Sequence, residues 1–159
     1  MGDRLELPER ILQLRKVDLF QDLPVNEIAA VALVATEVEA PMDSIVLKDD
    51  DSCVGLYVIV NGEVSAEQTS VDGTQVKQYY NWQAGQSFGM MALFQEASLD
   101  MTVRATQDSL LLRIERDEFH AIIREYPETA LRVCQELATR MNQLLQQLNS
   151  LHSSTESAS

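Results

Sequence analysis

The apolar residues of this chain change their spacing twice, and these changes divide it into three zones. In the first zone, residues 7 to 35, apolar side chains recur at the spacing of a helix face. Pro8 suits the first turn of one helix, and Pro24 opens a second. Asp22 is the expected N-cap of this second helix. The zone therefore predicts two helices in succession.

The second zone, residues 36 to 115, has the pattern of β-strands, with turn signals roughly every 8–12 residues. Its β-branched and aromatic runs are SIVLK, LYVIV, EVSAEQTSV, QVKQYYNW, MTVRA and SLLLRI. Asn61-Gly62 predicts a hairpin with a type I′ turn, in which both central residues need positive φ. Asp72-Gly73 predicts a second turn. The predicted class is α+β, an antiparallel β jelly-roll barrel flanked by N-terminal helices and a long C-terminal helix.

The third zone, residues 117 to 151, is helical again, with a break at Pro127. After this proline, apolar residues step alternately by four and three, which is the a/d pattern of a coiled coil. These residues are Ala130, Cys134, Leu137, Met141, Leu144, Leu148 and Leu151. The final segment, residues 152 to 159, is small and polar and predicts a flexible tail.

Two interpretations of this a/d face stay open. It packs on the chain's own barrel, or it is left for a partner while a second stripe faces inward. The second stripe is Leu131, Ala138 and Leu145, each a heptad apart. We favour the latter interpretation, with twofold pairing or a partner protein bound through Leu137, Met141, Leu144, Leu148 and Leu151.

Charge and composition narrow the range of partners. The chain has 25 acidic and 12 basic residues, a net charge of −13, and its bases are scattered. Such a surface repels phosphate backbones, so nucleic acid is not an expected partner. No apolar run is long enough to span a bilayer, although attachment to a membrane protein stays open. The charged start differs from a secretory signal. We expect a cytoplasmic protein with Cys53 and Cys134 buried and reduced.

Residues that would support catalysis or metal binding are few. The two histidines, His120 and His152, both lie in the last zone, whereas a barrel metalloenzyme needs several histidines inside the barrel. No glycine-rich phosphate loop is present. The aspartate run at residues 49–51 lacks the spacing of a calcium loop. The expected protein is therefore not an enzyme, and no metal site is expected.

Four segments stand in a telling order along the chain: LRKVDLFQDLPVNEI, LYVIVNGEV, AGQSFG and PETALRVCQELATRMNQ. Together they resemble the entry segment, hairpin, cassette approach and final helix of the cyclic nucleotide-binding domain of the catabolite-activator type. The resemblance extends from Ile11 to Leu148. It implies one domain at residues 7–151, with helices at 7–35, a barrel at 36–115 and helices at 117–151.

In that family the phosphate-binding cassette has approximately the pattern FGE-[aliphatic]-AL…R-[S/T]-A-x-V-x-A. The glycine turn presents N–H groups to the phosphate, the arginine pairs with it, and the glutamate accepts a hydrogen bond from the ribose. The residues that match here are Phe88, Gly89, Ala92, Leu93, Val103 and Ala105. The glutamate position is Met90, and the arginine position is Leu99. Asp100 and Met101 replace the two small residues that follow.

These replacements disfavour an ordinary nucleotide site. Loss of the arginine leaves a buried phosphate charge uncompensated, and Asp100 adds a like charge. Loss of the glutamate leaves a hydroxyl unpaired, at about 1–3 kcal/mol. A micromolar affinity is worth only about 8 kcal/mol. Arg104 falls at a variable position and is expected to point outward. The residues of family members that contact the purine correspond to Leu144 and Leu145.

The expected function is that of a non-catalytic regulatory or assembly module with a degenerate cassette and no required cofactor. The cassette-equivalent pocket comprises Phe88, Gly89, Met90, Met91, Ala92, Leu99, Asp100 and Met101. We expect Met90, Met91, Leu99 and Met101 to fill its interior. DNA binding is not expected, because no basic helix-turn-helix follows the long helix in this sequence. The alternative is a sensor that binds cAMP, cGMP or another small ligand in a Met-rich pocket.

Overall fold

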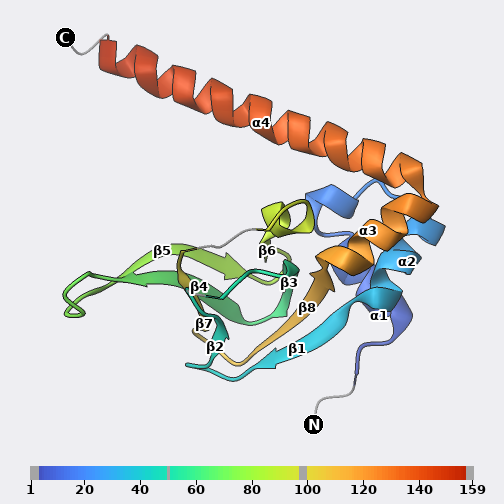
Figure 1. Cartoon of the computed structure of the whole chain (residues 1–159), viewed down its shortest axis with the longest axis horizontal. Helices are drawn as coiled ribbons and strands as arrows, with labels where there is room; N and C mark the ends of the chain where they lie inside the picture. Colours follow the sequence, from blue (N-terminus) through green and yellow to red (C-terminus); the bar gives the residue numbers. More distant parts are fainter. Residues whose placement is uncertain (1–3, 50, 97–99, 157–159) are drawn as a thin grey trace.

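Two four-stranded antiparallel sheets form the body of the domain, and helices cover one end of it (Figure 1). The computed structural model describes residues 4–49, 51–96 and 100–156. The first sheet has the order β1 (Thr36–Ala40), β8 (Ser109–Glu115), β3 (Gly55–Asn61) and β6 (Ser87–Phe88). The second has the order β2 (Ile45–Leu47), β7 (Thr102–Ala105), β4 (Glu63–Thr69) and β5 (Val76–Gln83). The expected jelly-roll barrel with flanking helices is confirmed.

The helical end contains the segments that precede and follow the barrel. They are α1 (Leu7–Leu14), the 3₁₀ turn η1 (Asp18–Phe20), α2 (Val25–Val34), α3 (Arg116–Glu125) and α4 (Pro127–Glu156). A further 3₁₀ turn, η2 (Met90–Leu93), follows β6. The N-cap of α2 is Pro24, with no side-chain cap hydrogen bond, so the prediction of Asp22 as its cap is wrong. Among the described residues, no helix combines the length and the hydropathy needed to cross a membrane.

Strand β3 is buried on both faces, which explains its unbroken apolar run. Leu56 and Val58 belong to the core cluster formed with the helices. Tyr57 and Ile59 belong to a second cluster inside the barrel. Alternate side chains of a strand point to opposite faces, so one run serves two cores. This strand therefore ties the helical end to the barrel.

Asn61-Gly62 is a corner between the two sheets and not a hairpin turn. Strand β3 pairs with β6 and β8, whereas β4 pairs with β5 and β7. Gly62 has φ 89°, but Asn61 is the last residue of β3 and is not among the described residues with positive φ. The type I′ prediction is therefore wrong. A Cβ on Gly62 would lie 2.5 Å from the carbonyl oxygen of Asp108, so this crossing requires glycine.

The predicted turn at Asp72-Gly73 does join paired strands, β4 and β5. The Gly73 amide donates to the Ser70 carbonyl at 2.8 Å, and Gly73 has φ 74°. The Asp72 carboxylate accepts hydrogen bonds from the Ser70 hydroxyl and from the amide and hydroxyl of Thr74. These hydrogen bonds lower the Asp72 pKa to about 2. The hairpin tip is thus held by one ionised carboxylate.

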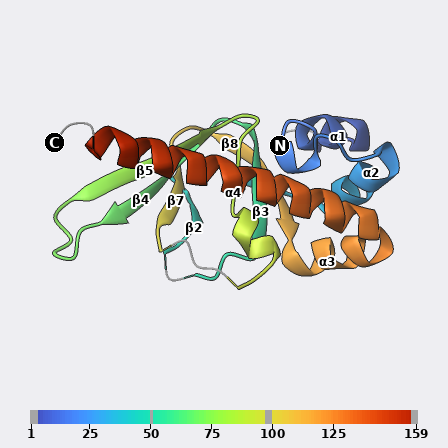
Figure 2. The same cartoon turned by 90° about the horizontal axis from the view of Figure 1, so that it is seen from above.

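Helix α4 leaves the helical end and runs over the strands toward the side of the β4–β5 hairpin (Figure 2). It extends to Glu156, so the predicted flexible tail at 152–159 is helical over its first five residues. At its start, the buried Thr129 hydroxyl donates to the buried Glu27 carboxylate of α2 at 2.6 Å. Val133 is buried one turn later. These two residues fix the direction in which α4 leaves the domain.

Candidate functional site: the cassette and the final helix

The cassette begins with a glycine turn that only glycine allows. Gly89 has φ 85°, and a Cβ there would lie 2.5 Å from the Gly55 carbonyl oxygen and 3.1 Å from Cys53 Sγ. A side chain would therefore be strained and would also clash with β3. Turn η2 follows at once, with Ala92 and Leu93 buried. The frame that the sequence predicts for a phosphate cassette is present.

The methionines of the cassette do not fill one pocket. Met90 is partly buried against the helical core, whereas Met101 packs on the barrel core. Met91 is exposed, so the prediction that it fills the interior is wrong. Leu99 lies outside the described residues. Asp100, with φ 52°, is exposed. The shared cassette motif therefore sends its side chains in three directions.

Aromatic rings occupy the barrel interior next to the cassette. Phe88 stacks on Tyr57 with ring centroids 4.9 Å apart and on Trp82 at 4.8 Å. Trp82 stacks in turn on Tyr80 at 5.7 Å. Burial raises the pKa of Tyr57 although Arg113 lies nearby. The sequence analysis missed this stack; the signal was that Tyr80 and Trp82 alternate in register with Ala66 and Val64.

Helix α3 holds the far end of η2. The His120 Nε2–H donates to the Leu93 carbonyl at 2.6 Å. Phe94 meets Phe119 edge to face, with centroids 5.9 Å apart. His120 thus has a packing role, as the sequence suggested. The position of the cassette is fixed by contacts with the helical end as well as with β3.

A cation reaches the cassette from α4, and the sequence analysis did not foresee it. Arg140 Nη1 lies 4.0 Å from Met90 Sδ. The same guanidinium lies 3.5 Å from Asp18 Oδ2 and 3.4 Å from Glu136 Oε1. Two carboxylates therefore already balance its charge. Arg104 points away from the interior, as expected, and pairs with Glu67 at 2.8 Å on the outer face of the second sheet.

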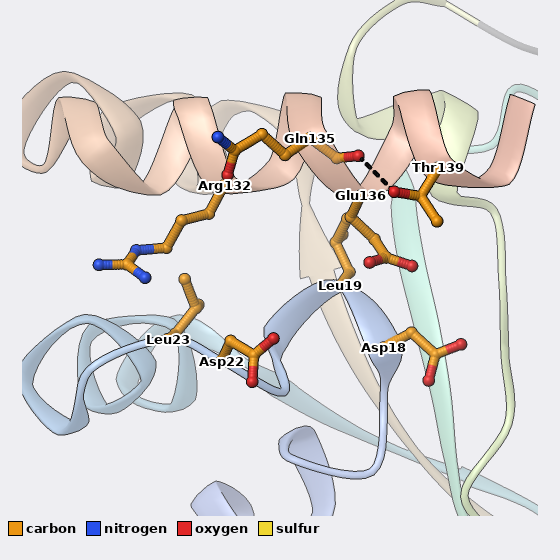
Figure 3. Close-up of a pocket in the computed structure, with 8 residues that line it drawn as sticks. All are labelled: Asp18, Leu19, Asp22, Leu23, Arg132, Gln135, Glu136 and Thr139. Atoms are coloured by element: carbon orange, nitrogen blue, oxygen red, sulfur yellow. Dashed lines mark hydrogen bonds between the residues drawn. The ribbon is translucent and has the colours of Figure 1, made fainter. Parts of the chain in front are cut away.

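A small polar cleft lies where α4 passes η1 (Figure 3). It has a volume of about 180 Å³ and is lined by Asp18, Leu19, Asp22, Leu23, Arg132, Gln135, Glu136 and Thr139. Figure 3 shows the Arg132 guanidinium at the end of the cleft opposite Asp18. No three His, Cys, Asp or Glu side chains of the described segments are grouped to hold a metal ion. The cleft is a polar seam between α4 and η1.

A larger apolar groove lies between η2 and α4. Its volume is about 680 Å³. Its lining residues are Met90, Met91, Phe94, Gln95, Cys134, Leu137, Ala138, Arg140, Met141 and Leu144. Cys134 is exposed here, so the expectation of two buried cysteines holds for Cys53 alone. The groove joins the cassette to the heptad face of the final helix.

Residues 37–126, more than half of the chain, match the family model described as "Cyclic nucleotide-binding domain". The chain belongs to the cyclic nucleotide-binding domain family. Its fold is shared with the N-terminal domain of a transcriptional regulator from Streptomyces coelicolor (22% identity, TM-score 0.79, 86% of this chain and 94% of that chain). It is also similar to the catabolite activator protein of Thermus thermophilus (25% identity, TM-score 0.68, 84% of this chain and 62% of that chain).

Curated relatives are much longer proteins. The chain is 27% identical over 109 residues to patatin-like phospholipase domain-containing protein 7 of Rattus norvegicus. It is 26% identical over 110 residues to patatin-like phospholipase domain-containing protein 6 of Homo sapiens. Each match covers 69% of this chain but only 8% of the relative. The similarity is therefore confined to this domain of those proteins.

Within this cyclic nucleotide-binding fold, α4 exposes a long apolar stripe. Met141, Leu144, Leu148 and Leu151 are 60–66% exposed. Leu137 is partly buried against the helical core. The second stripe, Leu131, Ala138 and Leu145, is exposed as well, so the prediction that it packs inward is wrong. The residues that pack inward are Thr129 and Val133, about a quarter-turn around the helix from the heptad face.

Proposed function

We propose that this domain is a non-catalytic regulatory and assembly module that does not bind cyclic nucleotide through the usual contacts of its family. The observation that carries the proposal is the environment of Met90. At the position of the ribose-binding glutamate stands a thioether, and the cation beside it, Arg140, is paired with Asp18 and Glu136. A match to a binding-domain family supports a non-catalytic role.

The electrostatics of the cassette oppose a cyclic phosphate. A phosphate seated on the Gly89 turn would need a nearby cation to offset its desolvation. Leu99 at the family's arginine position provides none. Recruiting Arg140 would require it to leave the two carboxylates, which would then face the phosphate as like charges. The geometry of the cassette therefore supports its role as part of the fold.

Helix α4 supports the assembly role. Residues 141–155 contain no Asp, Glu, Lys or Arg, although the chain carries a net charge of −13. Two copies can therefore bring this segment together without charge repulsion, whereas their remaining surfaces repel each other. An exposed apolar stripe of this length marks an interaction surface. We infer that α4 pairs with a second copy through its a and d positions.

The biological setting follows from the same features as part of the proposal. The domain would act in the cytoplasm as an appended or self-associating regulatory unit, without binding nucleic acid. Attachment to a membrane-associated protein is compatible with a module of this kind, since the similar domains in the curated relatives are small parts of much longer chains. The acidic surface favours contacts made through α4 over contacts made elsewhere.

Sedimentation velocity tests the assembly. The wild type is expected to sediment as a dimer, and Leu144→Glu as a monomer, because a buried charge at a heptad position is costly. Leu12→Glu is the matched control: Leu12 is similarly exposed but lies on α1, away from α4. A monomeric wild type at concentrations of about 100 μM, where a Kd of 1 μM would give mostly dimer, would contradict the proposal.

A second candidate function is favoured by the groove between η2 and α4. Its volume and apolar lining fall within the range of small-molecule sites, about 300–1,000 Å³. A sensor of an apolar ligand would use Met90, Met91 and Met141 as adaptable walls. Native mass spectrometry of the purified protein separates the two functions. A bound small molecule favours the sensor, and a mass equal to that of the chain or its dimer favours the assembly module.

A further inference from the structure

The second apolar stripe of α4 has no partner within its own domain. Leu145 is 53% exposed, and Leu131 and Ala138 are also exposed. With Cys134 and Met141 at a positions, this stripe occupies the e positions of the heptads. Val133 and Arg140, which contact the domain, occupy g positions. The domain therefore lies on the g flank of α4, and the e stripe lies on the opposite flank.

A parallel twofold pair gives the e stripe a partner. In a parallel coiled coil, a g residue of one helix lies beside an e residue in the next heptad of the other helix. The e residue one heptad after Arg140 is Leu145. An antiparallel pair would instead place g beside g, so both barrels would crowd the same flank of the seam. The parallel arrangement therefore suits this chain, because it keeps the two barrels on opposite sides.

The surface beside Arg140 is the apolar groove. Arg140 lines it together with Met91 and Phe94 of the cassette segment. Met91 is 63% exposed, and Phe94 is also exposed. These side chains lie on the g flank, where the second copy's e residue arrives. The groove has one cation, which Asp18 and Glu136 offset, so a neutral apolar side chain matches it better than an anion does.

We propose that Leu145 of one copy packs into the groove between η2 and α4 of the other copy, against Met91 and Phe94. The contact occurs twice in the pair, once for each groove. It rests on the proposed homodimer but adds a surface that a simple helix pair lacks. The segment that frames the nucleotide site in this family is thereby a wall of the subunit interface, and the groove is closed to small molecules in the dimer.

Cysteine pairing tests the contact directly. In a Cys134→Ser background, one variant carries Met91→Cys and another carries Leu145→Cys; Cys53 is buried and stays unmodified. Each variant alone places its two new thiols far apart in the pair. We expect a disulfide-linked dimer on mild oxidation of the equilibrated mixture, and none with either variant alone. A mixture of Leu12→Cys with Leu145→Cys is the matched control and should not cross-link.

Substitution with charge gives a second readout. Met91→Glu is expected to raise the dimer dissociation constant by about tenfold or more, since the change acts at both grooves. Leu12→Glu should leave the constant unchanged. If the variants sediment as dimers, yet the mixture does not cross-link and Met91→Glu has no effect, this contact is refuted while the homodimer stands. If the wild type is monomeric, the homodimer and the contact both fail.

Discussion

The hydrogen bond between Thr129 and Glu27 is expected to be the main polar contact that fixes α4 on the domain. It joins residues that are 102 positions apart, and both are buried. Thr129→Val keeps the shape of the side chain but removes the donor. The Glu27 carboxylate then stays buried without this partner. We expect the change to weaken the packing of α4 on α2.

The magnitude follows from the charge on the acceptor. A hydrogen bond to a charged group contributes about 1.5–3 kcal/mol, and a buried acceptor left unpaired costs a similar amount. We expect Thr129→Val to lower the free energy of unfolding by about 2–3 kcal/mol. For a domain of this size, that corresponds to a fall in Tm of about 5–10 °C. Replacing both partners, with Glu27→Leu added, should recover part of the loss.

Urea unfolding of the monomeric Leu144→Glu background measures this effect, because association then adds nothing to the apparent stability. Thr139→Val is the matched control: this α4 threonine is exposed, and its hydroxyl bonds only to the Gln135 carbonyl of the same helix. The control should change stability by less than about 0.5 kcal/mol. A loss equally small for Thr129→Val, or no recovery in the double variant, would refute the role given to this pair.

Two further outcomes follow from backbone and charge. Gly89→Ala should lower the free energy of unfolding by at least about 2 kcal/mol, since its Cβ meets the Gly55 carbonyl at φ 85°; unchanged thermal unfolding would contradict this. The Asp72 pKa, about 2, lies below the usual 3.8, so its contribution to stability is full above pH 4 and is lost as the pH falls through 2. An NMR titration of its carboxyl with a midpoint near 3.8 would show that the hairpin-tip hydrogen bonds do not form.

Much of the fold could be predicted from local patterns. The strand runs, the turn at Asp72-Gly73 and the heptad spacing after Pro127 all depend on neighbouring residues, and the structure confirms them. Strand β6 was missed because it has only two residues, Ser87 and Phe88, and it forms through pairing with β3. The Asn61-Gly62 prediction failed because a turn signal does not say which strands pair.

The candidate site shows a second limit of the sequence. The cassette motif predicted its own frame, but the side chain opposite Met90 comes from a residue 50 positions later in the chain. The heptad pattern of α4 identified two apolar stripes without showing which flank meets the domain. That choice depends on where Thr129 and Val133 are buried, and so on the packing of the helical end. Contacts between distant segments therefore decided what the local motifs could not.

Isothermal titration calorimetry with cAMP and with cGMP tests the central claim most directly. The claim is that the cassette keeps its shape but offers a cyclic phosphate no free cation, since Arg140 is held by Asp18 and Glu136. The predicted result is no saturable heat at nucleotide concentrations up to about 1 mM, where ΔG of binding would be only about −4 kcal/mol. Stoichiometric binding with a micromolar dissociation constant would contradict it.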